Sequence, residues 1–209
     1  MPLRNRVTPF GEIVALPARG TFMGNRGGAI HDDKRNIVRQ YASRRWICCL
    51  LEFRGHRRIV MSPDRYTELF FLDEAVALAA GHRPCAECRR ERFTAFRESW
   101  ALSVGVQPGT FLYADALDLE LHRARIDRAK KKVTWSSSLD SLPSGCFVEI
   151  GGSAYLVLGG ELLQWSPNGY VEKHRRSDDP DVSVLTPEPI VRCLRHGYRP
   201  ELHYSALTL

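Results

Sequence analysis

The chain has 209 residues, of which 44% are hydrophobic and 10% aromatic, and its formal net charge is +6. This composition argues against a disordered chain, and no apolar run approaches the roughly 18 residues that a transmembrane helix needs. Residues 1–12 lack the apolar stretch of a signal peptide. We therefore expect a cytoplasmic protein without a membrane partner, in which the six cysteines are metal ligands or buried thiols.

Positive charge is concentrated in two segments. Residues 1–60 carry 12 Lys or Arg against four Asp or Glu, and residues 122–132 carry six against one. The rest of the chain is net acidic. This clustering favours a polyanionic partner such as nucleic acid. The alternative is a basic protein with no such partner.

The first 72 residues have the pattern of short strands and turns. Strands are expected at 10–16, 45–53 and 66–71, a Gly-rich turn at 24–28, and a hairpin partner for the second strand at 57–61.

A pair of helices is predicted next. Asp73 has the position of an N-cap, followed by an Ala-rich helix to Ala80, with Gly81 as the residue that stops it. Pro84 suits the first turn of a second helix that reaches about Trp100.

The remainder of the chain alternates between helical and β patterns. A third helix is expected from about Asp115 into the basic run, followed by a linker or long loop at 136–145. Gly-Gly pairs then separate three strands of a β-meander, at 147–150, 153–158 and 161–165. A turn at 166–169 is expected to end the meander. A solvated loop at 177–181 and a short helix at 186–197 follow.

These elements predict an α+β fold. We expect a mixed or antiparallel sheet, a helix-knuckle-helix metal site and a C-terminal three-stranded meander. Residues 1–135 would form a basic, metal-binding region and residues 136–209 the meander with its helix, packed together as one unit. Cys146 and Cys193 are expected to be core thiols.

Cys85 and Cys88 form the only Cys-x2-Cys pair in the chain, between a helix stop and a basic segment. Two thiolates at this spacing can hold one metal ion from a tight turn. The alternative is a pair of buried helix cysteines.

The surrounding residues 68–92 resemble the second half of the metal-binding domain of the Ada methylated-DNA repair regulator. The shared pattern is an Ala-rich helix, a Gly-x-Arg-Pro turn, Cys-x2-Cys and basic residues, here EAVALAAGHRPCAECRRE. Residues 22–31 resemble the opening of small Ada-like modules that occur beside nucleases. The resemblance implies structural Zn²⁺ and DNA-related work, so we expect DNA in preference to RNA as the partner. The whole chain is also similar to a group of bacterial proteins.

The chain departs from the Ada pattern upstream, where the cysteines are adjacent rather than spaced, at Cys48 and Cys49. Neighbouring strand residues point to opposite faces, so one metal takes only one of them. The methyl-accepting cysteine of that family therefore has no counterpart that we can assign. The expected ligands are Cys49, Cys85, Cys88 and His31, with His82 and His56 as alternatives to His31.

Two segments have residue types suited to phosphate or metal chemistry. The Gly-rich turn can present backbone amides to a phosphate, with Arg26 pairing to it, although a plain β-turn explains it too. His31, Asp32 and Asp33 have the side chains of a nuclease metal site, or belong to a solvated loop. Pro2, after removal of Met1, is a secondary amine that can form a Schiff base with a sugar aldehyde, or simply a frayed terminus.

The basic run predicts a phosphate-binding helix face, or a solvated one. His122, Arg125 and Lys132 would share one face, with Arg128 close to it. Trp135 beyond the run could stack on a base. A second basic-aromatic segment is Arg44, Arg45 and Trp46.

The sequence thus favours a zinc-stabilised protein that binds nucleic acid in DNA repair or processing. The alternatives are an enzyme that cleaves nucleic acid, as a nuclease or glycosylase/lyase, and a structural or partner-binding protein. The residues leave open whether any reaction is catalysed.

Overall fold

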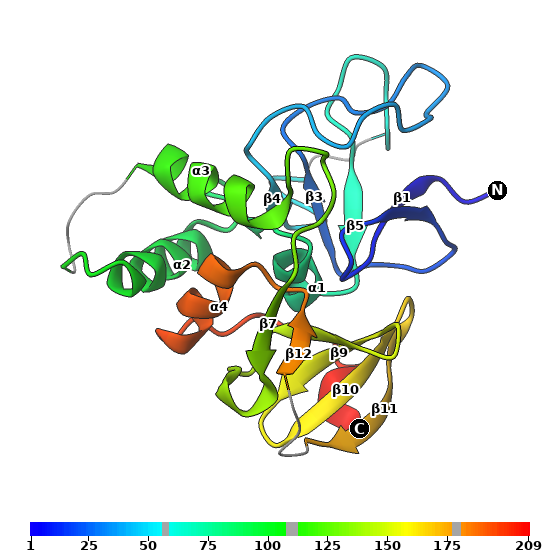
Figure 1. Cartoon of the computed structure of the whole chain (residues 1–209). Coiled ribbons are helices and arrows are strands. Elements are labelled where there is room, and N and C mark those ends of the chain that lie inside the picture. Colours follow the sequence, from blue (N-terminus) through cyan, green and yellow to red (C-terminus); the bar gives the residue numbers. More distant parts are fainter. Residues whose placement is uncertain (56–58, 108–112, 177–180) are drawn as a thin grey trace.

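Two six-stranded sheets and a group of helices make up the protein (Figure 1). The computed structural model describes residues 1–55, 59–107, 113–176 and 181–209. The N-terminal sheet is mixed, and the C-terminal sheet is antiparallel throughout. The fold class is therefore α+β, as predicted.

The N-terminal sheet has the strand order β2-β1-β5-β3-β4-β6. Its strands are β1 (Arg4–Val7), β2 (Ile13–Ala15), β3 (Phe22–Asn25), β4 (Ile47–Cys49), β5 (Leu69–Phe71) and β6 (Arg83–Pro84). Strands β2, β4 and β5 are shorter than the runs that predicted them, and β1, β3 and β6 were not predicted as strands. The return strand expected at 57–61 does not form over its described residues 59–61, where Met61 has a left-handed φ of 54° in a turn.

The C-terminal sheet has the strand order β11-β10-β9-β8-β12-β7. Its strands are β7 (Trp135–Ser138), β8 (Phe147–Ile150), β9 (Ser153–Leu158), β10 (Glu161–Ser166), β11 (Gly169–Arg175) and β12 (Asp181–Val184). Gly151 and Gly152 supply the positive φ angles, 57° and 79°, of the tight β8–β9 turn. The sheet is thus twice as wide as the three strands expected.

Two predictions about this region are wrong. The segment 136–145 is not a linker, because its serines pair with β12 as strand β7 and a 3-10 helix follows at Leu139–Ser141. The turn at 166–169 does not end the sheet, because β11 continues from it. Of the predicted loop at 177–181, only Asp181 lies within the described residues, where it begins β12.

Helix α1 (Glu74–Ala79) lies between the two sheets, and all six of its residues are buried (Figure 1). It has the caps that the sequence predicts: the Asp73 carboxylate accepts a hydrogen bond from the Val76 amide at 2.9 Å, and Gly81 follows with a φ of 83°.

Helices α2 (Arg90–Ser103), α3 (Ala114–Arg125) and α4 (Glu188–Arg195) pack against one another beside the sheets, and a short α5 (Ser205–Thr208) follows (Figure 1). None of the described helices is long and apolar enough to cross a bilayer.

Two helix boundaries differ from the prediction. Pro84 lies in β6 rather than in a helix, and α2 begins six residues later, at Arg90. Helix α3 ends at Arg125, because Ile126 turns to an extended conformation and pairs with Lys132. Of the basic run, residues 122–125 are therefore helical and residues 126–132 form a loop.

The core is continuous across the 135/136 division. Phe71 and Ala75 belong to the same buried cluster as Phe147, Leu156 and Tyr170. Hydrogen bonds from the buried start of α1 reinforce this contact. The second carboxylate oxygen of Asp73, Oδ2, accepts hydrogen bonds from the Tyr170 hydroxyl at 2.8 Å and from the backbone amide of residue 203 at 3.0 Å.

Candidate metal centre

Three cysteine sulfurs meet beside the N-terminal sheet. Cys49 ends β4, Cys85 follows β6, and Cys88 lies in the turn before α2. Their sulfur atoms all lie within 4.8 Å of one another. Cys49 and Cys85 are buried and Cys88 is partly exposed. The structure thus brings together the three cysteines predicted as ligands, close enough to hold one metal ion.

Parallel pairing of β4 with β6 aligns these residues. Cys48 pairs with Pro84, and the Cys85 amide donates to the Cys48 carbonyl at 2.9 Å. Cys85 is thereby fixed next to the end of β4, and the side chain of Cys49 points to the same side of the sheet. The next turn then brings Cys88 back to the same point.

Cys48 faces the opposite side of the sheet, as strand alternation requires. It is fully buried in the main core, where its sulfur accepts a hydrogen bond from Arg89 at 3.4 Å. Burial raises the pKa of the Cys48 thiol. This residue is a core thiol, which leaves Cys49 alone as the upstream ligand.

The cluster favours negative charge on one sulfur. Hydrogen bonds from the Cys49 and Cys88 thiols, together with the Cys88 and Glu87 backbone amides, lower the pKa of Cys85. The Glu87 amide lies 3.4 Å from the Cys85 sulfur. The same sharing of protons, together with burial, raises the pKa of Cys49. Soft, converging thiolates of this kind suit Zn²⁺, Cu⁺ or an iron–sulfur centre.

One side of the cluster is open to a small cavity of about 190 Å³. The three cysteines form part of its wall, and the polar side chains of Asn25 and Glu87 form another part. A tetrahedral metal ion held by three sulfurs has a fourth position to fill, either by a protein group or by water.

His31 is not part of the three-sulfur group. Its Nδ1 lies 2.6 Å from the Thr67 hydroxyl, and its Nε2 lies 3.2 Å from the Ser62 carbonyl oxygen. These bonds hold the loop after β3 against the segment before β5. The expectation that His31 is the fourth ligand is therefore not met by this arrangement.

Of the two alternative histidines, only His82 lies within the described residues. His82 is completely buried against Phe71 and Trp46, and its Nε2 accepts a hydrogen bond from Arg26 at 3.4 Å. Burial, followed by the charges of Arg26 and Arg125, lowers the pKa of His82 well below its ordinary value. His56 lies outside the described residues.

The candidate nuclease residues do not converge on a metal position. Asp32 accepts hydrogen bonds from the backbone amides of Lys34, at 3.0 Å, and Asn36, at 2.8 Å, so its carboxylate stabilises a turn. The Asn36 bonds are the main reason that the pKa of Asp32 is lowered. Asp33 is exposed, and so is Pro2 before the start of β1.

The predicted nucleic-acid residues divide into exposed and buried groups. Arg44, Arg45 and Arg128 are exposed, and Arg45 forms a surface ion pair with Asp115 at 3.0 Å. Trp135 is half-buried against apolar side chains of α2, α3, α4 and the C-terminal sheet, and its indole donates to the Thr186 carbonyl at 3.0 Å. The expectation that Trp135 stacks on a base does not fit this packing.

Arg26, Arg125 and Lys132 turn inward, contrary to their expected place on a phosphate-binding surface. All three line one cavity beneath the basic run. Sequence reasoning named each of them, but no local signal indicates that they meet, because residue 26 and residues 125–132 are joined only by tertiary packing.

A larger cavity of about 1040 Å³ adjoins the cysteine cluster at Cys85. The Gly-rich turn forms one wall through Gly27 and Gly28, and Arg44 and Arg45 form another. Exposed cations and a glycine turn therefore lie beside the candidate metal centre.

Comparisons with protein-family models, with curated proteins and with solved structures give no match for this chain.

Proposed function

We propose that Cys49, Cys85 and Cys88 bind a structural Zn²⁺ ion and that the protein binds nucleic acid, DNA in preference to RNA, next to this centre. The observation that carries the proposal is the convergence of the three sulfurs within 4.8 Å. Sulfur ligands are typical of structural zinc sites, and here they come from the end of β4, the residue after β6 and the turn before α2. The ion would tie the end of β4 to the start of α2, which no other covalent link joins.

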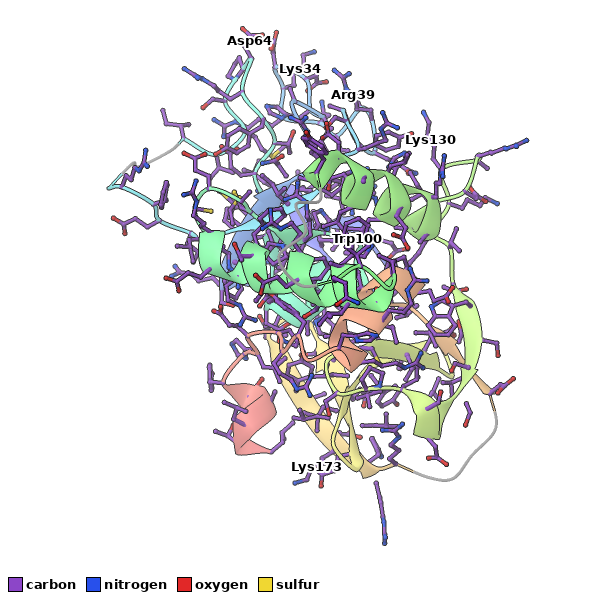
Figure 2. The ribbon with its side chains drawn as sticks, turned by 90° about the vertical axis from the view of Figure 1, so that its left-hand side faces the viewer. Lys34, Arg39, Asp64, Trp100, Lys130 and Lys173 are labelled. Atoms are coloured by element: carbon purple, nitrogen blue, oxygen red, sulfur yellow. The ribbon has the colours of Figure 1, made fainter. Side chains whose placement is uncertain are left out.

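The basic surface supports a polyanionic partner. Lys34, Arg39 and Lys130 lie along one edge of the molecule, at the end away from the C-terminal sheet (Figure 2). Arg44 and Arg45 line the cavity beside Cys85. Such a distribution of charge suits contacts to phosphates rather than to base edges, so we expect binding with little sequence preference. The resemblance of residues 68–92 to the Ada metal-binding domain favours a role in DNA repair or processing.

The first test is metal content. Zinc is measured by mass spectrometry in the purified wild-type protein, in Cys88→Ser and in Cys48→Ala as the matched control. We expect about one zinc per chain in the wild type and in Cys48→Ala, and loss of zinc with lower stability in Cys88→Ser, because metal binding is coupled to folding. Full zinc content in Cys88→Ser would show that this cysteine is not a ligand.

The second test is nucleic-acid affinity, measured by fluorescence anisotropy on single-stranded DNA, duplex DNA and RNA over a range of salt concentrations. We expect affinity that falls steeply as salt rises, with a slope of about −0.9 per phosphate neutralised on duplex DNA. Reversing the charge of Arg39 and Lys130 should weaken binding, whereas Lys173→Glu, on the C-terminal sheet, should have little effect. Absence of binding at low salt would refute this part of the proposal.

The same substrates run on a denaturing gel, with an abasic-site duplex added, test for chemistry. We expect intact strands, because His31 and Asp32 are engaged in structural hydrogen bonds. Site-selective cleavage, or a trapped covalent adduct at the N-terminus, would instead show that the protein is a nuclease or lyase.

A further inference from the structure

A second cavity, of about 660 Å³, lies beneath the basic run and is bordered by the loop after β1 and by Trp46. Its lining is strongly cationic and includes Arg4, Arg26, Arg39, Arg125, Lys130, Lys131 and Lys132. Glu12 is the one acidic residue among the described residues that line it, and it is exposed. An excess of positive charge on this scale requires an explanation.

The two arginines at the base of the cavity are buried without a carboxylate partner. Arg26 is 3% exposed and Arg125 is 1% exposed. Arg26 donates to the Gly11 carbonyl at 2.8 Å, and Arg125 donates to the Gly81 carbonyl at 2.8 Å. Each guanidinium carbon lies 4.0 Å from the centre of the Trp46 ring. The arginines are therefore fixed in position, but only neutral groups accept their hydrogen bonds.

The third inner cation is Lys132, whose ammonium group donates to the Ala79 carbonyl at 2.6 Å. This carbonyl and that of Gly81 lie at the C-terminal end of α1, which bears a partial negative charge. That charge amounts to about half an elementary charge at most. This partial charge compensates only a small part of the positive charge of the three cations.

Nearby carboxylates do not make up the difference. Asp118 attracts Arg125 through space, but its two oxygens are held by Arg83 at 2.8 and 2.7 Å. Glu12 forms no ion pair with the described cations. One donor, the Arg125 Nε, is buried without any hydrogen-bond partner among the described residues.

Burial of these positive charges lowers the pKa values of Arg26, Arg125 and Lys132. Burial, reinforced by the charge of Arg26, lowers the pKa of Lys132 to about 7. Burial lowers the pKa of Arg26 to about 9, and burial together with the charge of Arg26 lowers that of Arg125 to about 9. An anion in the cavity would offset the cost of burying these charges.

We propose that this cavity binds a phosphate monoester, with the phosphate held near Arg26, Arg125 and Lys132. A phosphate monoester carries a charge of about −1.5 to −2 at neutral pH and several strong acceptor oxygens, which matches the uncompensated charge and the free donor. The exposed Lys130, Lys131 and Arg39 at the cavity would attract the anion from solvent.

The cavity is larger than a phosphate ion and has an apolar wall. Its volume lies in the range of about 300–1,000 Å³ that is usual for small-ligand sites. Phe10, Ile37 and Val38 line it beside the cations. These side chains can receive the organic part of the ligand. The phosphate would belong either to a free nucleotide or to the end of a nucleic-acid strand, since both present the same group.

The experiment starts from protein dialysed into chloride buffer, with thermal unfolding followed over a series of inorganic phosphate concentrations at constant ionic strength. We expect the melting temperature to rise with phosphate, as it does for any ligand that binds only the native state. Lys132→Met should melt at a higher temperature than the wild type in chloride, because a buried charge is removed. It should bind phosphate at least about tenfold more weakly, which corresponds to the loss of one strong contact.

The control is Lys173→Met, which removes a lysine on the C-terminal sheet and should leave the response to phosphate unchanged (Figure 2). A melting temperature of the wild type that does not respond to phosphate would overturn the proposal, whatever the variants do. So would a Lys132→Met variant that is destabilised in chloride and binds phosphate normally, because the cations would then be structural.

Two further titrations identify the source of the phosphate. Oligonucleotides that differ only in a terminal 5′- or 3′-phosphate are compared by anisotropy, and nucleoside monophosphates are tested by calorimetry. A preference of about tenfold or more for one phosphorylated end supports a strand terminus. Tight binding of a monophosphate without such a preference supports a free nucleotide. A protein that keeps its metal and its duplex affinity, but responds to no phosphate monoester, would overturn this proposal and leave the proposed function standing.

Discussion

Glu74, the first residue of α1, offers the sharpest test of how the two halves of the chain are joined. Its side chain is completely buried and forms ion pairs with Arg89 at 3.0 Å and Arg92 at 3.2 Å. It also accepts hydrogen bonds from the Tyr198 hydroxyl at 2.5 Å and from the Glu201 amide at 2.8 Å. A single carboxylate thus connects α1, α2 and the segment after α4.

Glu74→Gln removes the negative charge and keeps the shape. The amide oxygen can still accept from Arg89, and the Tyr198 hydroxyl can turn to accept from the new NH₂ group. What is lost is charge compensation for Arg89, whose side chain is 1% exposed. Breaking a buried ion pair costs about 3–5 kcal/mol. The half-exposed Glu201 still pairs with Arg89 at 2.8 Å. We therefore expect a loss of unfolding free energy at the low end of this range, about 3 kcal/mol.

Urea unfolding followed by tryptophan fluorescence and by circular dichroism gives the free energy of unfolding. The matched control is Glu161→Gln, whose carboxylate pairs with Lys173 at 3.5 Å on the surface and should contribute less than about 0.5 kcal/mol. If Glu74→Gln costs no more than this control, the buried carboxylate does not hold the two halves together.

Two further predictions concern stability. Gly81→Ala should lower the free energy of unfolding in urea by about 2 kcal/mol, because φ is 83° and the added Cβ would lie 2.6 Å from Arg125 Cδ. The control is Gly197→Ala, where φ is 98° but the space around the added Cβ is open, and it should cost only about 1 kcal/mol. Equal losses in the two variants would contradict the steric argument. Burial lowers the pKa of Lys132 from its ordinary value of 10.5 to about 7 in the folded protein. Between these two values the unfolded state binds more protons, so this group makes stability rise with pH. The stability advantage of Lys132→Met over the wild type should therefore be greatest below pH 7 and shrink as the pH is raised to 10; a constant difference would contradict the shift.

The sequence predicted best those features that depend on neighbouring residues. The caps of α1 at Asp73 and Gly81 are local, and both are present. The same holds for the tight turn at Gly151 and Gly152. Alternation along a strand was enough to predict that only one of Cys48 and Cys49 faces the metal position. That this residue is Cys49 follows from the convergence of its sulfur with those of Cys85 and Cys88.

The errors arose where tertiary pairing decides. Pro84 was expected in a helix because helix starts favour proline, but pairing with Cys48 places it in a strand. The serines of β7 have no apolar periodicity, and only β12 makes them a strand. A count of charges also cannot distinguish Arg128, which is exposed, from Arg125, which is buried.

The central position of α1 has a consequence for how the chain folds. The helix has six residues, too few to be stable alone, and the groups that satisfy its buried start lie about 100 residues or more away, at Tyr170 and Glu201. Contacts of such long sequence separation slow folding, because a large loop must close before they form. During synthesis, α1 therefore emerges well before Tyr170 and Glu201. We expect the buried start of α1 to remain without these partners until the segment that follows α4 has left the ribosome.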